Sequence, residues 1–146
     1  MAIVTECQVI VRPATLEDEP VVYQLAANMA TSFAVERRAF RNSFVSLIEA
    51  DEAFVFVADV GGRVGGYLLG FTHLTFYANG PVAWVEEIAV QPQLRRQRLG
   101  ALLMAEFESQ ATAAGAALIA LATRRAASFY DAIGYEPSAT YFRKKL

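Results

Sequence analysis

The chain has 146 residues, of which 55% are hydrophobic and 19% are charged, and its formal net charge is −2. This length fits a single domain, residues 1–146, and the slightly negative charge argues against sequence-independent binding of nucleic acid. No apolar run approaches the roughly 20 residues that cross a membrane, the first residues lack the pattern of a secretory signal, and the single cysteine, Cys7, provides neither a disulfide framework nor a cysteine metal site. We therefore expect a cytoplasmic protein with no metal, no nucleic-acid partner and no membrane partner.

The N-terminal part of the chain predicts one strand and two helices. Apolar residues alternate over 8–12 before a proline, which is typical of a strand. Acidic residues at 17–19 suit the first turn of a helix that continues to about residue 30, because negative charge is favourable near a helix N-terminus. A second helix over about 35–50 carries an apolar face formed by Phe40, Phe44, Leu47 and Ile48.

The middle of the chain predicts an antiparallel meander. Aromatic and β-branched residues fill 54–60, and the Gly-Gly-Arg sequence at 61–63 is typical of a hairpin turn. The partner strand covers 64 to about 74, a turn follows at 77–81, and a third strand covers 82–90.

The C-terminal part predicts helices that alternate with strands. A long helix over about 99–114 ends at a glycine, and a short buried strand follows at 118–122. A further helix covers 126–133, and a last strand covers 141–144. The resulting order, β-α-α-β-β-β-α-β-α-β, predicts an α/β (α+β) fold in which a mixed, mostly antiparallel sheet is flanked by helices.

The junction between the third strand of the meander and the long helix is a candidate anion site. Pro92 ends the strand, and the N–H groups of the first helical turn have no partner inside the helix, where the dipole is also positive. Arg95, Arg96 and Arg98 add positive charge, which favours a bound anion at this position, although a merely solvated helix start is the alternative. Gly100 removes a side chain where a ligand or a neighbouring strand must come close.

This junction resembles the cofactor motif of the Gcn5-related N-acetyltransferase (GNAT) superfamily, Q/R-x-x-G-x-G/A, which holds the pyrophosphate of acetyl-coenzyme A (acetyl-CoA). Arg95 takes the first position and Gly100 the last, whereas Arg98 stands where the family usually has its first glycine. Arg98 still offers a backbone N–H if its φ is negative, and its guanidinium can reach a phosphate.

Two further segments resemble the same family. Residues 129–136, Phe-Tyr-Asp-Ala-Ile-Gly-Tyr-Glu, look like its F-Y-x-x-x-G-[FY] segment. Arg12-Pro13-Ala14 before an acidic helix start is typical of its N-terminus. Three matches in the family's order imply the GNAT acyl-CoA N-acyltransferase fold over nearly the whole chain.

The resemblance also implies which residues bind acetyl-CoA. In the family the strand before the phosphate loop diverges from its neighbour, and the pantetheine arm enters the gap and meets backbone N–H groups. The residues at those positions are Ile88, Ala89 and Val90 on the strand, and Arg95, Arg96, Gln97, Arg98, Leu99, Gly100 and Ala101 around the pyrophosphate. Thr123 stands where many relatives have an asparagine that contacts the pantetheine, so we expect this contact to be weakened or made by water.

Three residues are candidates for acid–base chemistry. Glu86 and Glu87 are adjacent on a strand, so their side chains point to opposite faces unless a bulge intervenes. We favour Glu86 as the base, because family members with such an acidic pair are thought to use its first residue. The alternative is that neither residue is catalytic, with one carboxylate in solvent and the other in a buried ion pair. A carboxylate can bind an ammonium group and remove its proton.

Tyr130 matches the family tyrosine close to the coenzyme sulfur and is the candidate acid, with core packing as its alternative.

Together these features predict an N-acetyltransferase that transfers the acetyl group of acetyl-CoA to a primary amine by direct attack in a ternary complex. The alternative is a non-catalytic acyl-CoA-binding sensor or interaction module on the same fold, since Arg98 and Thr123 depart from the family pattern. The sequence leaves open whether the acceptor is a small molecule or a peptide amine, and whether the chain forms a homodimer.

Overall fold

The computed structural model describes residues 7–146 and contains one five-stranded sheet. The expectation drawn from the first residues about a secretory signal lies outside this range. The strands are β1 (Val9–Pro13), β2 (Ala53–Val60), β3 (Arg63–Leu74), β4 (Pro81–Val90) and β5 (Ile119–Leu121). They lie in the order β1-β2-β3-β4-β5, with β1 to β4 antiparallel and β5 parallel to β4.

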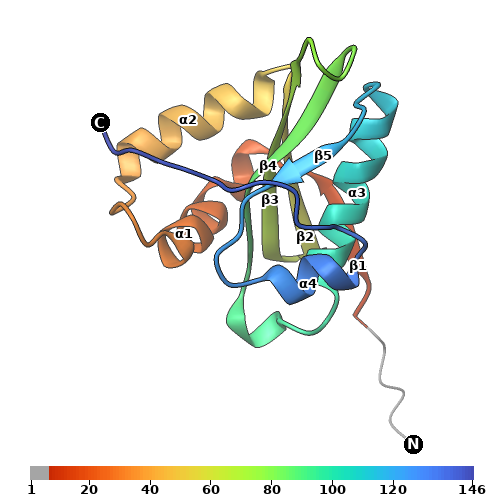
Figure 1. Cartoon of the computed structure of the whole chain (residues 1–146). Coiled ribbons are helices and arrows are strands. Elements are labelled where there is room, and N and C mark those ends of the chain that lie inside the picture. The colour runs from red at the N-terminus through yellow and green to blue at the C-terminus, as the bar shows by residue number, and fades with distance from the viewer. Residues whose placement is uncertain (1–6) are drawn as a thin grey trace, which may run out of the picture.

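Helices cover both faces of this sheet (Figure 1). The four α-helices are α1 (Glu19–Met29), α2 (Arg37–Glu49), α3 (Leu99–Ala113) and α4 (Ala127–Ala132). Short 3-10 turns, Leu16–Asp18 and Pro92–Leu94, precede α1 and α3. α1 and α2 pack on one face of the sheet and α3 on the other, so the predicted α/β architecture with a mixed, mostly antiparallel sheet is confirmed.

The alternation of strand side chains divides the core into two layers. Phe56 and Ala58 of β2 belong to the cluster under α3, whereas Val55 and Val57 belong to the cluster under α1 and α2. Because both faces are covered, β2 is apolar along most of its length and does not alternate with polar residues.

A buried ion pair ties α1 to α2. The Glu19 side chain is 2% exposed and accepts hydrogen bonds from both terminal nitrogens of Arg37, one of them at 2.7 Å. Arg41 lies 3.6 Å from the same carboxylate. The two helices are thereby held at a fixed spacing above the sheet.

The predicted strand at 141–144 is wrong. Residues 133–146 contain no strand, and the chain after α4 runs across the front of the sheet toward the loop between α1 and α2 (Figure 1). Side chains of this segment find tertiary partners in place of a sheet ladder: Tyr141 stacks on Trp84, and Arg143 donates a 2.7 Å hydrogen bond to Ser32 Oγ. The neighbouring strand β5 is only 3 residues long and offers a short edge for pairing.

Within residues 7–146, no helix is both long and apolar enough to cross a membrane.

Candidate active site

Strand β4 separates from β5 in the middle of the sheet. The two strands pair only where Ala83, Trp84 and Val85 face Ile119–Leu121. Beyond Val85, the edge of β4 that faces β5 has no strand partner among the described residues. The backbone of Ile88, Ala89 and Val90 therefore borders an open edge, which is the geometry that the family resemblance implies for them.

A β-bulge lies at the point where the strands separate. Leu69 of β3 pairs with Glu87 and the next residue, Gly70, pairs with Val85, so Glu86 is the extra residue of the bulge. Glu86 is exposed, whereas Glu87 is partly buried and lines a cavity beneath α1 and α2. The structure thus brings Glu87 to the cavity and leaves Glu86, the residue that the sequence favoured, at the solvent-facing bulge.

Among residues 7–146, Glu87 has one hydrogen-bond partner, the hydroxyl of Tyr67, which donates to Oε1 at 2.9 Å. Burial raises the pKa of Glu87; the hydrogen bond from Tyr67 opposes this effect, and the negative charge of Glu86 adds to it. The pKa of Glu87 is raised overall, toward the range in which a carboxylate is an effective proton acceptor near neutral pH.

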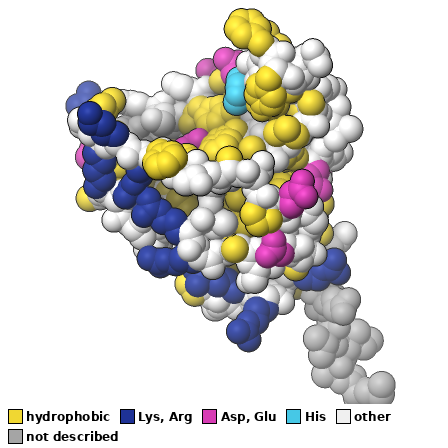
Figure 2. Space-filling view, viewed as in Figure 1, with side chains coloured by type: hydrophobic (Ala, Val, Ile, Leu, Met, Phe, Trp, Pro, Cys, Tyr) yellow, Lys and Arg dark blue, Asp and Glu magenta, His cyan; other side chains and the backbone are white. Residues whose placement is uncertain are grey.

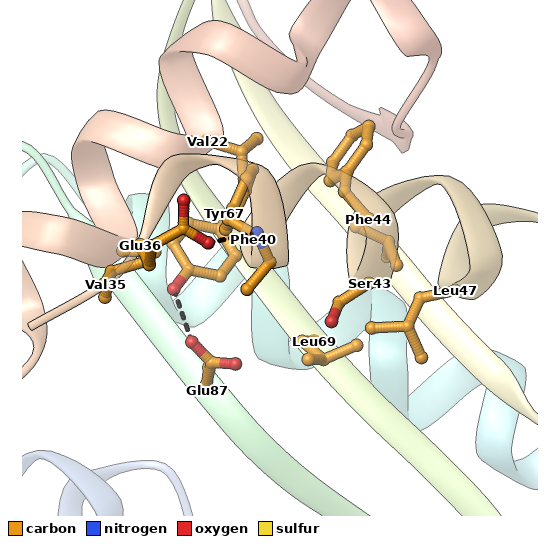
Figure 3. A pocket seen from close by; sticks show the side chains of 13 residues that line it. Val22, Val35, Glu36, Phe40, Ser43, Phe44, Leu47, Tyr67, Leu69 and Glu87 are labelled. Atoms are coloured by element: carbon orange, nitrogen blue, oxygen red, sulfur yellow. Dashed lines mark hydrogen bonds between the residues drawn. The ribbon is translucent and has the colours of Figure 1, made fainter. Parts of the chain in front are cut away.

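The cavity under α1 and α2 has a volume of about 330 Å³ (Figure 3). Its wall is mostly apolar and includes Val22, Ala26, Val35, Ala39, Phe40, Phe44, Leu47, Val55 and Leu69. Its polar groups come from Glu36, Ser43, Tyr67 and Glu87, and no Lys or Arg of the described residues lines it. The carboxylate of Glu36 caps α2 by accepting from the N–H groups of Arg38 and Ala39, which leaves Glu87 as the carboxylate available to a ligand.

The loop from β4 to α3 presents a row of free backbone donors. Among the described residues, the N–H groups of 96–101 have no hydrogen-bond acceptor. Arg96 and Arg98 have positive φ values, 69° and 66°, and α3 begins at Leu99 immediately after them. Successive N–H groups that alternate between left-handed and right-handed conformations form a concave surface that binds anions.

The condition that the sequence analysis set for Arg98, a negative φ, is not met. Its φ of 66° lies in the left-handed region, where a glycine carries no steric cost and an arginine does. This explains in physical terms why the family's motif usually has glycine at this position. The Arg98 N–H remains free of a partner in spite of the changed conformation.

The arginine side chains of this loop are available to a ligand. Arg95, Arg96 and Arg98 are exposed, and none of them takes part in the ion pairs found among the described residues. Lys and Arg side chains run down the left side and along the lower part of the face in Figure 2, beside and below the hollow lined by hydrophobic side chains. Hence the loop combines free N–H donors with uncompensated positive charge.

Glycines set the close packing around this loop. At Gly65 of β3, a Cβ would lie 2.5 Å from Leu94 Cδ1, so the glycine lets the loop rest directly on the sheet. At Gly100 a Cβ would lie 3.3 Å from the ring of Phe129. The close neighbour of Gly100 within the chain is therefore α4, which the sequence did not indicate.

The candidate acid, Tyr130, is 7% exposed and packs edge-on against Phe129 and Tyr135. Burial raises its pKa, so the hydroxyl is protonated at neutral pH. No hydrogen bond to the Tyr130 hydroxyl is found among the described residues. Every fully buried side-chain oxygen or nitrogen of these residues has a hydrogen-bond partner, so the Tyr130 hydroxyl is not fully buried and reaches solvent. The Thr123 hydroxyl is occupied locally, since it accepts a 3.1 Å hydrogen bond from Ala126 N–H at the start of α4.

Three features of the site were missed by the sequence reasoning: the Tyr67 hydroxyl on Glu87, the cavity, and Gly65 under the phosphate loop. The strand pairing indicates the contact of Tyr67 with Glu87. Tyr67 lies opposite Ala89, which is two residues from Glu87 and on the same face of the sheet. Among residues 7–146, no group of three or more His, Cys, Asp or Glu side chains is placed to hold a metal ion.

A sheet that opens between β4 and β5, with an anion-binding helix start at the end of β4, is the arrangement of an acetyltransferase domain. Residues 51–137 match the family described as "Acetyltransferase (GNAT) domain", and the chain belongs to this family. GNAT acetyltransferases use acetyl-CoA, and the free N–H groups and unpaired arginines of the loop fit a pyrophosphate.

Individual relatives agree with this assignment. The chain is 31% identical over 141 residues to an aminoalkylphosphonate N-acetyltransferase of Salmonella typhimurium, and the match covers 92% of this chain and 90% of that protein. Among solved structures, glucosamine-6-phosphate N-acetyltransferase from Arabidopsis thaliana has a TM-score of 0.83 at 16% identity, covering 94% of this chain and 98% of the other. AAC(6')-Iy, solved in complex with the bisubstrate analogue CoA-S-monomethyl-acetylneamine, has a TM-score of 0.79 at 18% identity, covering 95% and 99%.

Proposed function

We propose that this protein is an N-acetyltransferase that transfers the acetyl group of acetyl-CoA to a small primary amine by direct attack in a ternary complex, with Glu87 as the base. The observation that carries the proposal is the placement of the Glu87 carboxylate in a cavity of about 330 Å³, next to the open edge of β4. The amine and the coenzyme would thus approach the same strand from its two sides.

The acceptor amine carries a proton at neutral pH, so the reaction needs a residue that can remove it. A primary alkylamine has a pKa near 10 and is mostly ammonium at neutral pH, so it must lose a proton before its nitrogen can attack. The Glu87 carboxylate binds the ammonium and accepts this proton, directly or through one water, and its raised pKa makes it a better acceptor than an ordinary carboxylate.

Acetyl-CoA supplies a thioester whose carbonyl carbon forms the new bond to nitrogen while its bond to sulfur breaks. The sulfur leaves as a thiolate and needs a proton, for which the solvent-accessible hydroxyl of Tyr130 is the proposed donor. The loop residues Arg95, Arg96, Gln97, Arg98, Leu99, Gly100 and Ala101 bind the pyrophosphate through free N–H groups and guanidinium groups. Ile88, Ala89 and Val90 present backbone groups to the pantetheine arm, and Thr123 contacts it through water.

The acceptor is a small molecule in this proposal. A volume of about 330 Å³ is at the lower end of the range for small-molecule pockets. The mostly apolar wall suits a short alkyl chain, and the single available carboxylate suits one ammonium group. The similarity to an aminoalkylphosphonate N-acetyltransferase supports this class of acceptor. A cytoplasmic location is part of the proposal.

Steady-state kinetics on a panel of small amines, with coenzyme binding measured by calorimetry, tests the proposal. Glu87→Gln is expected to lower kcat by about 100-fold or more with coenzyme affinity unchanged, because a general base contributes roughly 10²–10⁴-fold. Tyr130→Phe is expected to lower kcat by about tenfold or more. Glu49→Gln, an exposed carboxylate at the end of α2, is the matched control and should behave as wild type.

Three results would contradict the proposal. Full activity of both Glu87→Gln and Tyr130→Phe would remove these residues from the mechanism, and a loss of activity confined to Glu86→Gln would return the base to the first residue of the pair. Tight coenzyme binding without thiol release on any amine would favour the alternative, a non-catalytic acyl-CoA sensor.

A further inference from the structure

The side chain of Ser43 interrupts the apolar face that α2 turns toward the cavity. Its neighbours one helical turn away, Ala39 and Leu47, line the same cavity. Of the described residues of α2, Ser43 is the only polar one in the cavity wall. In Figure 3 its hydroxyl points from α2 toward Leu69 of β3 and the interior of the cavity.

The Ser43 hydroxyl is available to a ligand. Hydroxyls inside helices often donate to the carbonyl one turn back, as that of Thr112 in α3 does to Glu108 at 2.7 Å. No such bond, and no other hydrogen bond of the Ser43 hydroxyl, is found among residues 7–146. The other hydroxyl of the cavity wall, that of Tyr67, already donates its proton to Glu87.

Ser43 faces the strand position beside the proposed base. Leu69 of β3 pairs with Glu87 of β4, and side chains at paired positions of antiparallel strands begin about 5 Å apart. Because the Ser43 hydroxyl points toward Leu69, it lies across the cavity from that pair. A short amine with its ammonium on Glu87 therefore extends its alkyl chain over Leu69 and beneath Ser43.

The charges of the wall favour a neutral group at the far end of such a chain. The wall contains the carboxylates of Glu36 and Glu87, and no Lys or Arg of the described residues lines it. An anionic substituent would lose its water there beside like charges and without a cation, which is costly. A hydroxyl group carries no charge and can either donate to or accept from the hydroxyl of Ser43.

We infer that Ser43 determines the specificity for the acceptor, and that the acceptor is a short amino alcohol whose ammonium binds Glu87 and whose hydroxyl binds Ser43. This inference rests on the proposed function and narrows its class of acceptor. An alkylamine of the same length displaces water from the Ser43 hydroxyl without replacing the lost hydrogen bond. Polar groups of a binding site discriminate in this way against an analogue that lacks the matching group.

Two pairs of amines test the inference: ethanolamine with propylamine, and propanolamine with butylamine. The members of each pair differ only by a hydroxyl in place of a methyl group. Ser43→Ala is expected to raise KM for the amino alcohols by about fivefold to tenfold, and to change KM for the alkylamines by less than about twofold. The kcat values should be retained, because Glu87 is unchanged.

Ser46→Ala is the matched control for Ser43→Ala. Ser46 lies three residues further along α2, is exposed, and is not part of the cavity wall, so its replacement should change KM for none of the four amines. Alanine is a better helix former than serine, so neither variant should lower the thermal unfolding midpoint.

Calorimetric binding of ethanolamine and propylamine to the coenzyme A-loaded chain separates this inference from the proposed function. Weaker binding of ethanolamine by Ser43→Ala, with unchanged binding of propylamine, supports the inference even if no amine is acetylated. Turnover of all four amines with an equal effect of Ser43→Ala on both members of each pair overturns the inference and leaves the proposed function in place.

Two results with the wild type would also overturn the inference. One is a preference for aminomethylphosphonate over ethanolamine, because the acceptor would then carry an anion into the cavity. The other is the absence of both binding and turnover of the two amino alcohols when alkylamines are acetylated.

Discussion

The hydroxyl of Tyr67 on β3 donates a 2.9 Å hydrogen bond to Oε1 of Glu87 on β4. Burial is the largest cause of the raised pKa of Tyr67, followed by the charge of Glu87, so the hydroxyl keeps its proton and acts only as a donor. The Tyr67 side chain is almost fully buried, which fixes the carboxylate in one orientation toward the cavity. Tyr67 is thus a positioning residue that also lowers the pKa of the proposed base.

Tyr67→Phe should shift the acidic limb of the pH profile of kcat/KM to higher pH. The hydrogen bond stabilises the ionised form of Glu87, so its removal raises the pKa of Glu87 further above its ordinary value. Because the base must be ionised to accept a proton, activity then falls at a higher pH, by roughly one pH unit. The measurement is kcat/KM from pH 5 to 9; a uniform loss of activity with an unshifted limb would contradict the pKa effect.

Glu86→Gln should move the same limb in the opposite direction. The negative charge of Glu86 raises the pKa of Glu87, so the neutral glutamine lets that pKa fall and extends activity to lower pH. The shift is expected to be smaller than that of Tyr67→Phe, since Glu86 is exposed and its charge is screened by water and salt. A shift that vanishes at high salt would identify the effect as electrostatic, whereas a shift to higher pH would be inconsistent with it.

The sequence was sufficient for the order of strands and helices up to α4, because alternation and helical periodicity are local properties of the chain; only the strand expected at 141–144 is absent from the described residues. The bulge at Glu86 was not predictable in this way, since it lies opposite Leu69 and Gly70 of the neighbouring strand, where Phe107 of α3 packs against Gly70. The left-handed conformation of Arg98 was hidden for a similar reason, as arginine gives no sign of a positive φ. The contact of Arg143 with Ser32 joins residues 111 positions apart, and no local pattern reports such a pair.

Replacement of Arg98 separates the two contributions of this residue to the phosphate loop. Arg98→Gly removes the guanidinium and also the steric cost of a φ of 66°, whereas Arg98→Ala removes only the guanidinium. We expect both variants to weaken coenzyme A binding by about threefold to tenfold, and the glycine variant to be more stable than the alanine variant by about 1 kcal/mol. Calorimetry at two salt concentrations and urea unfolding give the two quantities. Unchanged coenzyme affinity in both variants would show that the guanidinium does not contact the coenzyme.

Glu19→Gln should destabilise the pairing of α1 and α2 by about 1–3 kcal/mol at neutral pH. The hydrogen bond from Arg37 is the largest cause of the lowered pKa of Glu19 in the folded state. The ionised Glu19 carboxylate therefore stabilises the folded state at pH values above 4.5, its ordinary pKa. This stabilisation is lost as the pH falls through the lowered pKa of the folded state. Urea unfolding at several pH values should show a lower free energy of unfolding for Glu19→Gln at pH 7 and a shallower decline below about pH 4.5. Glu49→Gln is the exposed control, and an equal acid dependence of Glu19→Gln and wild type would contradict the argument.

Gly70→Ala tests whether the bulge depends on the close approach of α3. A Cβ at Gly70 would lie 2.5 Å from Cζ of Phe107, whose side chain is fully buried and has no free space into which to move. Overpacking of this kind costs about 1–3 kcal/mol, so the free energy of unfolding should fall by that amount. Gly80→Ala is the matched control, because nothing lies within 4 Å of the corresponding Cβ. Because Phe107 stays in place, β3 has to shift against β4 and Glu87 leaves the cavity, so kcat should fall together with stability in Gly70→Ala and remain at the wild-type value in Gly80→Ala. Loss of stability with an unchanged kcat would contradict the link between the bulge and α3.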